Sequence, residues 1–257
     1  MQQKMQDFII LEWIYLPSDY FEETVAISRN NYQVTIQDGK VEAKLELLQY
    51  EHDPSLKDII EDTLNHRFRG MQLLTHREYQ LSYAGRYRVH PDGHRDVFIT
   101  VPTAKLKVSP SLADIVITHK DGTFYDSRKE RIEKKANLAN LAEKHGPRDS
   151  IARSLLESYH ESIRDPDNEL VHLYEICDIL AKGFNNKTKA CSALALSESR
   201  WRTLSRLANN KPIKQGRHRG KFLGILRDAT EAELKKARDI AQTFIIAYLQ
   251  YLDKQSS

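Results

Sequence analysis

Apolar and polar residues alternate along short segments in the first half of the chain. One alternating pair, Tyr32 to Ile36 and Val41 to Leu45, flanks the step Asp38-Gly39. Asp-Gly is favoured in two-residue hairpin turns, because both central residues of such a turn take positive φ. Two further Asp-Gly steps have strand-like neighbours: Asp92-Gly93 and Asp121-Gly122. This pattern predicts an antiparallel, β-rich domain over residues 1–126.

Within this first domain, one segment has helical rather than strand periodicity. Asp53-Pro54 precedes it, and Asp at the N-cap with Pro in the first turn is typical of a helix start. Its apolar residues are spaced by three and four and are expected to share one buried face: Leu56, Ile59, Ile60, Leu64 and Phe68. We therefore expect one helix within the β-rich domain.

The periodicity changes to three and four from residue 127 onward. A mixed-charge segment, residues 127–149, is predicted to be a helical connector that ends near Gly146-Pro147. A helical-bundle domain is predicted over residues 150–257, with helices near 151–163, 168–184 and 197–207 and a last helix after Thr230. Asp167 or Asn168 is expected to cap the second of these, and Thr230 and Glu233 to form a capping box on the last. The predicted fold class is α+β, with an all-α C-terminal domain.

Composition narrows the class of protein. Hydrophobic residues make up 40% of the 257 residues, which suffices for real cores. The longest apolar run, residues 244–249, is far shorter than the roughly 20 residues of a membrane-spanning helix. The N-terminal residues lack the pattern of a secretory signal. Two cysteines, Cys177 and Cys191, do not have the spacing of a disulfide framework or a cysteine zinc site. We expect a cytoplasmic protein that does not contact membranes.

Positive charge is concentrated in one window. Residues 187–227 hold eleven Lys or Arg and one acidic residue, Glu198, a net charge of +10. The whole chain carries +3, so the remaining residues sum to −7. Such a basic patch is typical of nucleic-acid binding. The alternative is that these cations pair with acidic residues of the N-terminal domain.

A glycine-containing basic segment, here called the basic loop (residues 209–228), lies between the last two predicted helices. Arg217-His218 lies at its centre, and flanking positive charge favours a neutral imidazole that can accept a proton from a ribose 2′-hydroxyl. His218 is the candidate acid/base, and Arg217 or Arg219 the candidate phosphate clamp. The residues expected to contact nucleic acid are Arg206, Asn209, Lys211, Lys214, Arg219 and Lys221. This chemistry needs neither a metal nor another cofactor.

The order of a helix, a basic loop with Arg217-His218 and a long closing helix resembles the helical domains of the HEPN superfamily. It is most similar to the Apea-like branch, in which a β-rich domain comes first, and the resemblance covers residues 150–253. It implies RNA binding or endoribonuclease activity in antiviral defence or toxin systems, and a homodimer that brings two Arg/His sets together. The family motif places His four to six positions from Arg. Here Arg217 is adjacent to His218 and Arg206 is further away, so the active pair stays open.

Two other interpretations compete with RNA binding. Residues 189–207 have the pattern of a helix-turn-helix, with Arg200, Arg202 and Arg206 as readers of a DNA groove and Ala195 where the turn often has Gly. The basic loop could also dock a protein partner in a regulator without catalytic activity. His90 and His94 suggest a metal pair, but the Pro-Asp-Gly between them favours a hairpin turn, and a third ligand is not evident.

Overall fold

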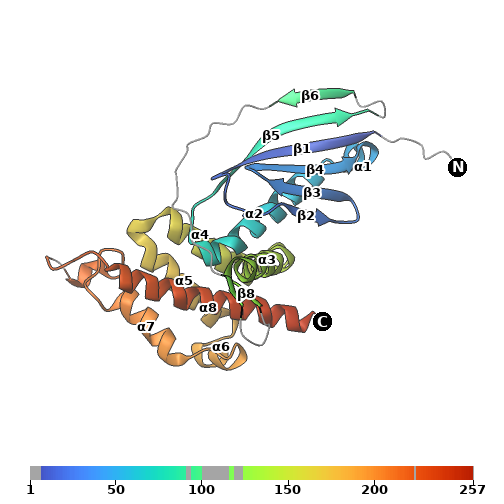
Figure 1. Cartoon of the computed structure of the whole chain (residues 1–257). Coiled ribbons are helices and arrows are strands. Elements are labelled where there is room, and N and C mark those ends of the chain that lie inside the picture. Colours follow the sequence, from blue (N-terminus) through green and yellow to red (C-terminus); the bar gives the residue numbers. More distant parts are fainter. Residues whose placement is uncertain (1–6, 91–93, 100–115, 119–123, 223, 257) are drawn as a thin grey trace. The chain divides into compact units, whose positions relative to one another are not determined.

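The computed structural model describes residues 7–90, 94–99, 116–118, 124–222 and 224–256 (Figure 1). The chain forms two compact units. The N-terminal unit comprises residues 1–62 and 79–132, and the helical unit comprises residues 63–78 and 133–257. Two helices, α2 (Leu56–Thr75) and α3 (Ser127–His145), each contribute residues to both units.

A six-stranded antiparallel sheet forms most of the N-terminal unit, with strand order β2-β3-β4-β1-β5-β6. The bounds of these strands are β1 (Phe8–Leu16), β2 (Val25–Ser28), β3 (Tyr32–Gln37), β4 (Lys40–Glu46), β5 (Gln80–Val89) and β6 (Arg95–Ile99). A separate antiparallel pair consists of β7 (Val116–Thr118) and β8 (Phe124–Asp126). Every second residue of β1 is buried, so one face of the sheet carries the core: Ile9, Leu11, Trp13 and Tyr15.

The Asp38-Gly39 hairpin is confirmed. Gln37 pairs with Lys40 across β3 and β4, and Asp38 and Gly39 have φ of 48° and 82°. Both residues lie in the left-handed region that a two-residue hairpin of this type requires. The other two predicted turns, Asp92-Gly93 and Asp121-Gly122, lie outside the described residues.

The predicted helix near residue 56 is present, but one residue of its buried face was wrong. Four of the five residues predicted for that face are buried: Leu56, Ile60, Leu64 and Phe68. Ile59 is 49% exposed, because the buried stripe follows the four-residue spacing and turns Ile59 away from it. A second, short helix that the pattern did not predict, α1 (Leu47–His52), directly follows β4.

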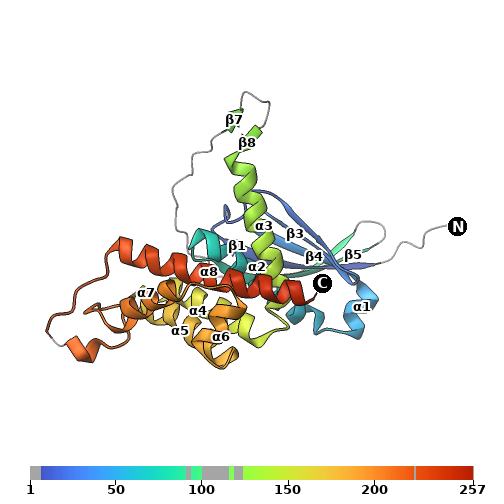
Figure 2. The same cartoon turned by 90° about the horizontal axis from the view of Figure 1, so that it is seen from below.

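The remaining described elements are helical, which confirms the α+β fold class with a helical C-terminal region (Figure 2). Their bounds are α4 (Ser150–Arg164), η1 (Pro166–Asn168), α5 (Glu169–Gly183), α6 (Lys187–Ala193), α7 (Glu198–Asn209), η2 (Arg219–Phe222) and α8 (Glu231–Gln255). The Thr230–Glu233 capping box of α8 is confirmed in both hydrogen bonds. Asn168 flanks α5, but its side chain forms no cap hydrogen bond.

One apolar cluster holds the helical unit together. It combines the buried faces of α4, α5, α7 and α8, and α5 packs directly against α4, α6, α7 and α8. The predicted stripe of α5 is fully buried: Leu170, Leu173, Ile176, Cys177 and Leu180. On α8, Leu234 and Leu252 lie at the edge of the cluster and the residues between them on the stripe are buried.

A largely buried polar cluster joins three helices of the same unit and His76, the residue that follows α2. Arg238 on α8 donates two hydrogen bonds to Glu169 on α5, at 2.6 and 2.9 Å. The hydroxyl of Tyr159 on α4 lies 3.2 Å from Nδ1 of His76 and accepts a hydrogen bond from Gln242 at 2.8 Å. Burial, and secondly the charge of Arg238, lowers the pKa of His76 to about 4. His76 is therefore neutral near pH 7, and the hydrogen bonds of the cluster connect α4, α5 and α8.

Within the helical unit, α2 and α3 cross at Gly70. A β-carbon at this position would lie 2.8 Å from Cα and Cβ atoms of Ala139 and Ala142 and from the carbonyl oxygen of Leu138. Two of these three neighbours are backbone atoms, which cannot move as a flexible side chain can. The close approach of the two helices therefore depends on glycine.

We predict that Gly70→Ala lowers the free energy of unfolding by about 1–2 kcal/mol, because overpacking outweighs the better helix propensity of Ala. Urea denaturation followed by circular dichroism measures this difference. Gly220→Ala is the control, since a β-carbon there meets nothing within 4 Å. Equal loss of stability in both variants would contradict a packing constraint at Gly70.

Candidate nucleic-acid interface

The basic loop folds back onto the end of α7. The backbone N–H of Arg217 donates to the carbonyl of Ala208 at 2.7 Å. A β-carbon at Gly216 would lie 2.9 Å from the same carbonyl oxygen, so the loop approaches the helix end closely only with glycine there. This hydrogen bond brings the backbone of Arg217 and His218 close to the last residue of α7, Asn209.

A second set of backbone hydrogen bonds joins the two arms of the loop. The N–H of Lys214 donates to the carbonyl of Arg227, and the N–H of Arg227 donates to the carbonyl of Pro212, both at 2.9 Å. Ile213, between them, is buried in the core of the helical unit. The loop is thus irregular in secondary structure, yet its base is anchored by backbone pairing and by an apolar side chain.

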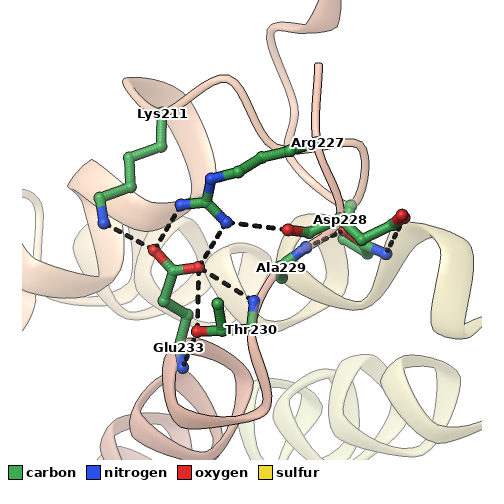
Figure 3. Close-up of polar contacts among 7 residues, drawn as sticks. Lys211, Arg227, Asp228, Ala229, Thr230 and Glu233 are labelled. Atoms are coloured by element: carbon green, nitrogen blue, oxygen red, sulfur yellow. Dashed lines mark hydrogen bonds and ion pairs between the residues drawn. The ribbon is translucent and has the colours of Figure 1, made fainter. Parts of the chain in front are cut away.

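Glu233, in the first turn of α8, ties both arms to the helix (Figure 3). Its carboxylate accepts from Lys211 at 2.6 Å and from two nitrogens of Arg227 at 2.8 Å each. It also accepts from the N–H of Thr230 at 3.0 Å, as one half of the capping box. The Arg227 guanidinium, with the Lys211 ammonium, holds the pKa of Glu233 well below its usual range.

Two arginines on either side of His218 are held by groups near and on α5. Arg217 pairs with Asp178 at 2.9 Å, and its guanidinium lies over the ring of Tyr174, 4.9 Å from the centroid. Arg219 donates to the carbonyl of Gly216 at 3.1 Å, to the carbonyl of Asp167 at 2.8 Å and to the side chain of Asn168. The Asn168 side chain thus accepts from Arg219 and donates to Asp165 at 2.7 Å.

Three predicted residues remain available to a ligand. The side chains of Arg206, His218 and Lys221 are exposed, and within the described part of the chain no ion pair or side-chain hydrogen bond engages them. Asn209 is half-buried; its Nδ2 donates weakly to Ser205 at 3.4 Å, and its buried Oδ1 has no hydrogen-bond partner among the described residues. These side chains come from α7 and from the centre of the loop that folds back onto it.

The other predicted cations have acidic partners inside the helical unit. Lys211 pairs with Glu233, and Lys214 pairs with Asp228 at 3.1 Å. Both acidic residues lie at the C-terminal end of the loop or just beyond it. Part of the positive charge counted from the sequence is therefore used to fold the loop.

The sequence-based prediction missed four residues that contact the basic loop or pair within it: Tyr174, Asp178, Arg227 and, as an ion-pair partner, Glu233. Of these, only Glu233 was indicated by the sequence, as part of the capping box. Tyr174 and Asp178 are one turn apart on α5, which places them on one face, but nothing in their spacing indicates an arginine from a distant loop.

The helix-turn-helix segment consists of α6, a turn in which Ala195 has φ of 50°, and α7. Both helices pack on α5. Of the three predicted groove readers, Arg202 lies 3.6 Å from Glu198 and Arg200 donates to Thr243 at 3.3 Å, which leaves Arg206 without a partner among the described residues.

Within the described ranges, no group of three His, Cys, Asp or Glu residues is arranged to hold a metal ion. None of the helices that the structure describes is long and apolar enough to cross a membrane. No protein-family model, curated protein or solved structure matches the chain.

We predict that Glu233→Gln lowers the free energy of unfolding by roughly 1 kcal/mol at pH 7, because charge-assisted bonds to two partly exposed cations are removed. The pKa of Glu233 is lowered in the folded state. The contribution of the Glu233 charge to the free energy of unfolding is therefore complete above the unfolded carboxyl pKa of about 4.3. It declines as the pH falls toward the lower pKa of the folded state. Denaturation of both proteins from pH 7 to pH 2.5 measures the difference.

Asp239→Asn serves as the matched control, since it removes a carboxylate from an exposed i,i+4 pair with Lys235 on the same helix. Such a pair is expected to contribute a few tenths of a kcal/mol. A Glu233→Gln difference that does not shrink at low pH would show that the charge of Glu233 is not what stabilises the loop.

Proposed function

We propose that the helical unit binds RNA through the basic loop and the end of α7, with His218 as the acid/base for cleavage of the bound strand. The observation that supports this is the hydrogen bond from Arg217 to Ala208, which holds the centre of the loop against α7. It holds Arg217 and the exposed His218 next to the last turn of α7, the helix that carries the exposed Arg206.

An irregular basic loop suits a flexible single strand better than a duplex. Readers of duplex DNA usually insert a helix or a β-ribbon into the major groove, whereas specific contacts to RNA are mostly made with unpaired nucleotides. On α7, Arg200 and Arg202 have other partners, which weakens the interpretation of this helix as a groove reader. RNA is therefore preferred to DNA as the ligand.

The arrangement around His218 suits cleavage without a metal. A neutral imidazole accepts the proton of a 2′-hydroxyl as the 2′-oxygen attacks the phosphorus. The bond from phosphorus to the 5′-oxygen breaks, which leaves a 2′,3′-cyclic phosphate, and the 5′-oxygen takes a proton from water. Arg217 and Arg219, on either side of His218, can stabilise the charge that develops on the phosphate oxygens.

We predict that the full chain binds labelled single-stranded oligouridylate and transfer RNA with steep salt dependence. Replacing Arg206 or Lys221 with Ala should weaken binding and reduce the slope of log affinity against log salt by about 0.7 for each phosphate that is no longer neutralised. Fluorescence anisotropy over a series of salt concentrations measures both quantities.

The control is Lys254→Ala, which removes an exposed cation at the other end of α8. Equal effects of all three variants would mean that net charge, not the loop, drives binding. Tighter binding of duplex DNA than of RNA would favour the helix-turn-helix interpretation. If the protein binds neither RNA nor DNA, a protein partner would be favoured.

We predict metal-independent cleavage of the same RNAs in EDTA, with the cyclic phosphate as product. His218→Ala should abolish cleavage and leave binding nearly unchanged, because His218 is exposed and has no side-chain bond to the described part of the fold. Gel electrophoresis and end-group analysis measure this. Binding without cleavage by the wild type would reduce the function to RNA binding alone.

A further inference from the structure

The ion pair between Arg217 and Asp178 places a carboxylate where a phosphate should bind. Asp178 Oδ2 lies 2.9 Å from Nη1 of Arg217. Phosphate and carboxylate oxygens both accept from the guanidinium fork, so they compete for the same donors. An incoming phosphate also meets the negative charge of Asp178 at close range, which opposes its approach.

The ion pair has fewer hydrogen bonds than the two bidentate arginine pairs of this unit. Only one nitrogen of Arg217 contacts Asp178, whereas Arg227 and Arg238 each donate to Glu233 or Glu169 through two. The two side chains are 33% and 51% exposed, so water and ions screen the pair. A single hydrogen bond in solvent can be displaced by an anion with several oxygens.

Asp178 is not needed to position Arg217. The backbone N–H of Arg217 is fixed by Ala208, and its guanidinium rests on the ring of Tyr174. A cation over an aromatic ring is attracted to its face whether or not a carboxylate is present. Removal of the Asp178 charge would therefore leave Arg217 in place with its full fork available.

We propose that Asp178 is a built-in competitor that occupies Arg217 in the free protein and is displaced by a phosphate of the RNA backbone. This inference rests on the proposed RNA binding and adds its regulation at the same site. Asp178 lowers the affinity for RNA, because it neutralises Arg217 until an RNA phosphate takes its place. In the paired state the field around His218 is less positive than the sequence indicates.

The test compares Asp178→Asn with the wild-type chain, using labelled single-stranded oligouridylate as the probe. Affinity should rise roughly two- to fivefold, the range expected for freeing one exposed ion pair. In the wild type, RNA binding separates Asp178 from Arg217, and the freed carboxylate takes up a cation from solution. The Asn variant has no such uptake, so the slope of log affinity against log salt should become steeper.

Two matched variants separate this effect from net charge. Asp253→Asn makes the same charge change near the C-terminal end of α8, about 30 Å along the helix from Glu233 at 1.5 Å per residue (Figure 2). It should leave affinity and slope unchanged. In an Arg217→Ala background, Asp178→Asn should have no further effect, because the group for which it competes is gone.

The outcomes are distinct. If the wild type binds RNA and Arg217→Ala weakens it, but Asp178→Asn binds equally or more weakly, Asp178 is a positioning residue and the competitor inference fails alone. An equal gain from Asp253→Asn also overturns it. If the wild type does not bind RNA at any salt concentration, the proposed function itself fails. Circular dichroism of each variant shows that the fold is retained.

Discussion

The carboxylate of Glu233 is the group on which the geometry of the basic loop depends. It joins Lys211 from the start of the loop, Arg227 from its end and the first turn of α8. Because α8 is anchored by a long apolar face in the core, whatever is bound to Glu233 is fixed relative to that core. The two ends of the mostly irregular loop are thereby held in place relative to the core.

Five cations of the basic loop and the end of α7 fall into two groups. Lys211, Lys214 and Arg227 pair with acidic residues in or just after the loop, and their charge is used to fold it. Arg206 and Lys221 remain exposed and, in the described ranges, unpaired. A count of charges along the sequence therefore overstates the positive field available to a ligand.

Arg217 and Arg219 belong to neither group, since both are tethered to the region of α5. One reaches Asp178 and Tyr174, and the other reaches the turn before the helix at Asn168. The spacing of the two guanidinium groups around His218 is consequently set by α5, which packs against four other helices. Beside Glu233 on α8, this helix is a second link between the buried core of the unit and the exposed side chains of the loop.

Sequence alone determined the features that depend on near neighbours. The Asp38-Gly39 turn, the capping box at Thr230 and the apolar stripe of α5 were predictable, because each is encoded within a few residues. The central residues of the proposed site, Arg217 and His218, were also predicted from local composition, and their role stays a prediction. The partners of the arginines were not, since Asp178 lies 39 residues from Arg217 and Asn168 lies 51 from Arg219. Only the packing of α5 against the loop decides those pairs.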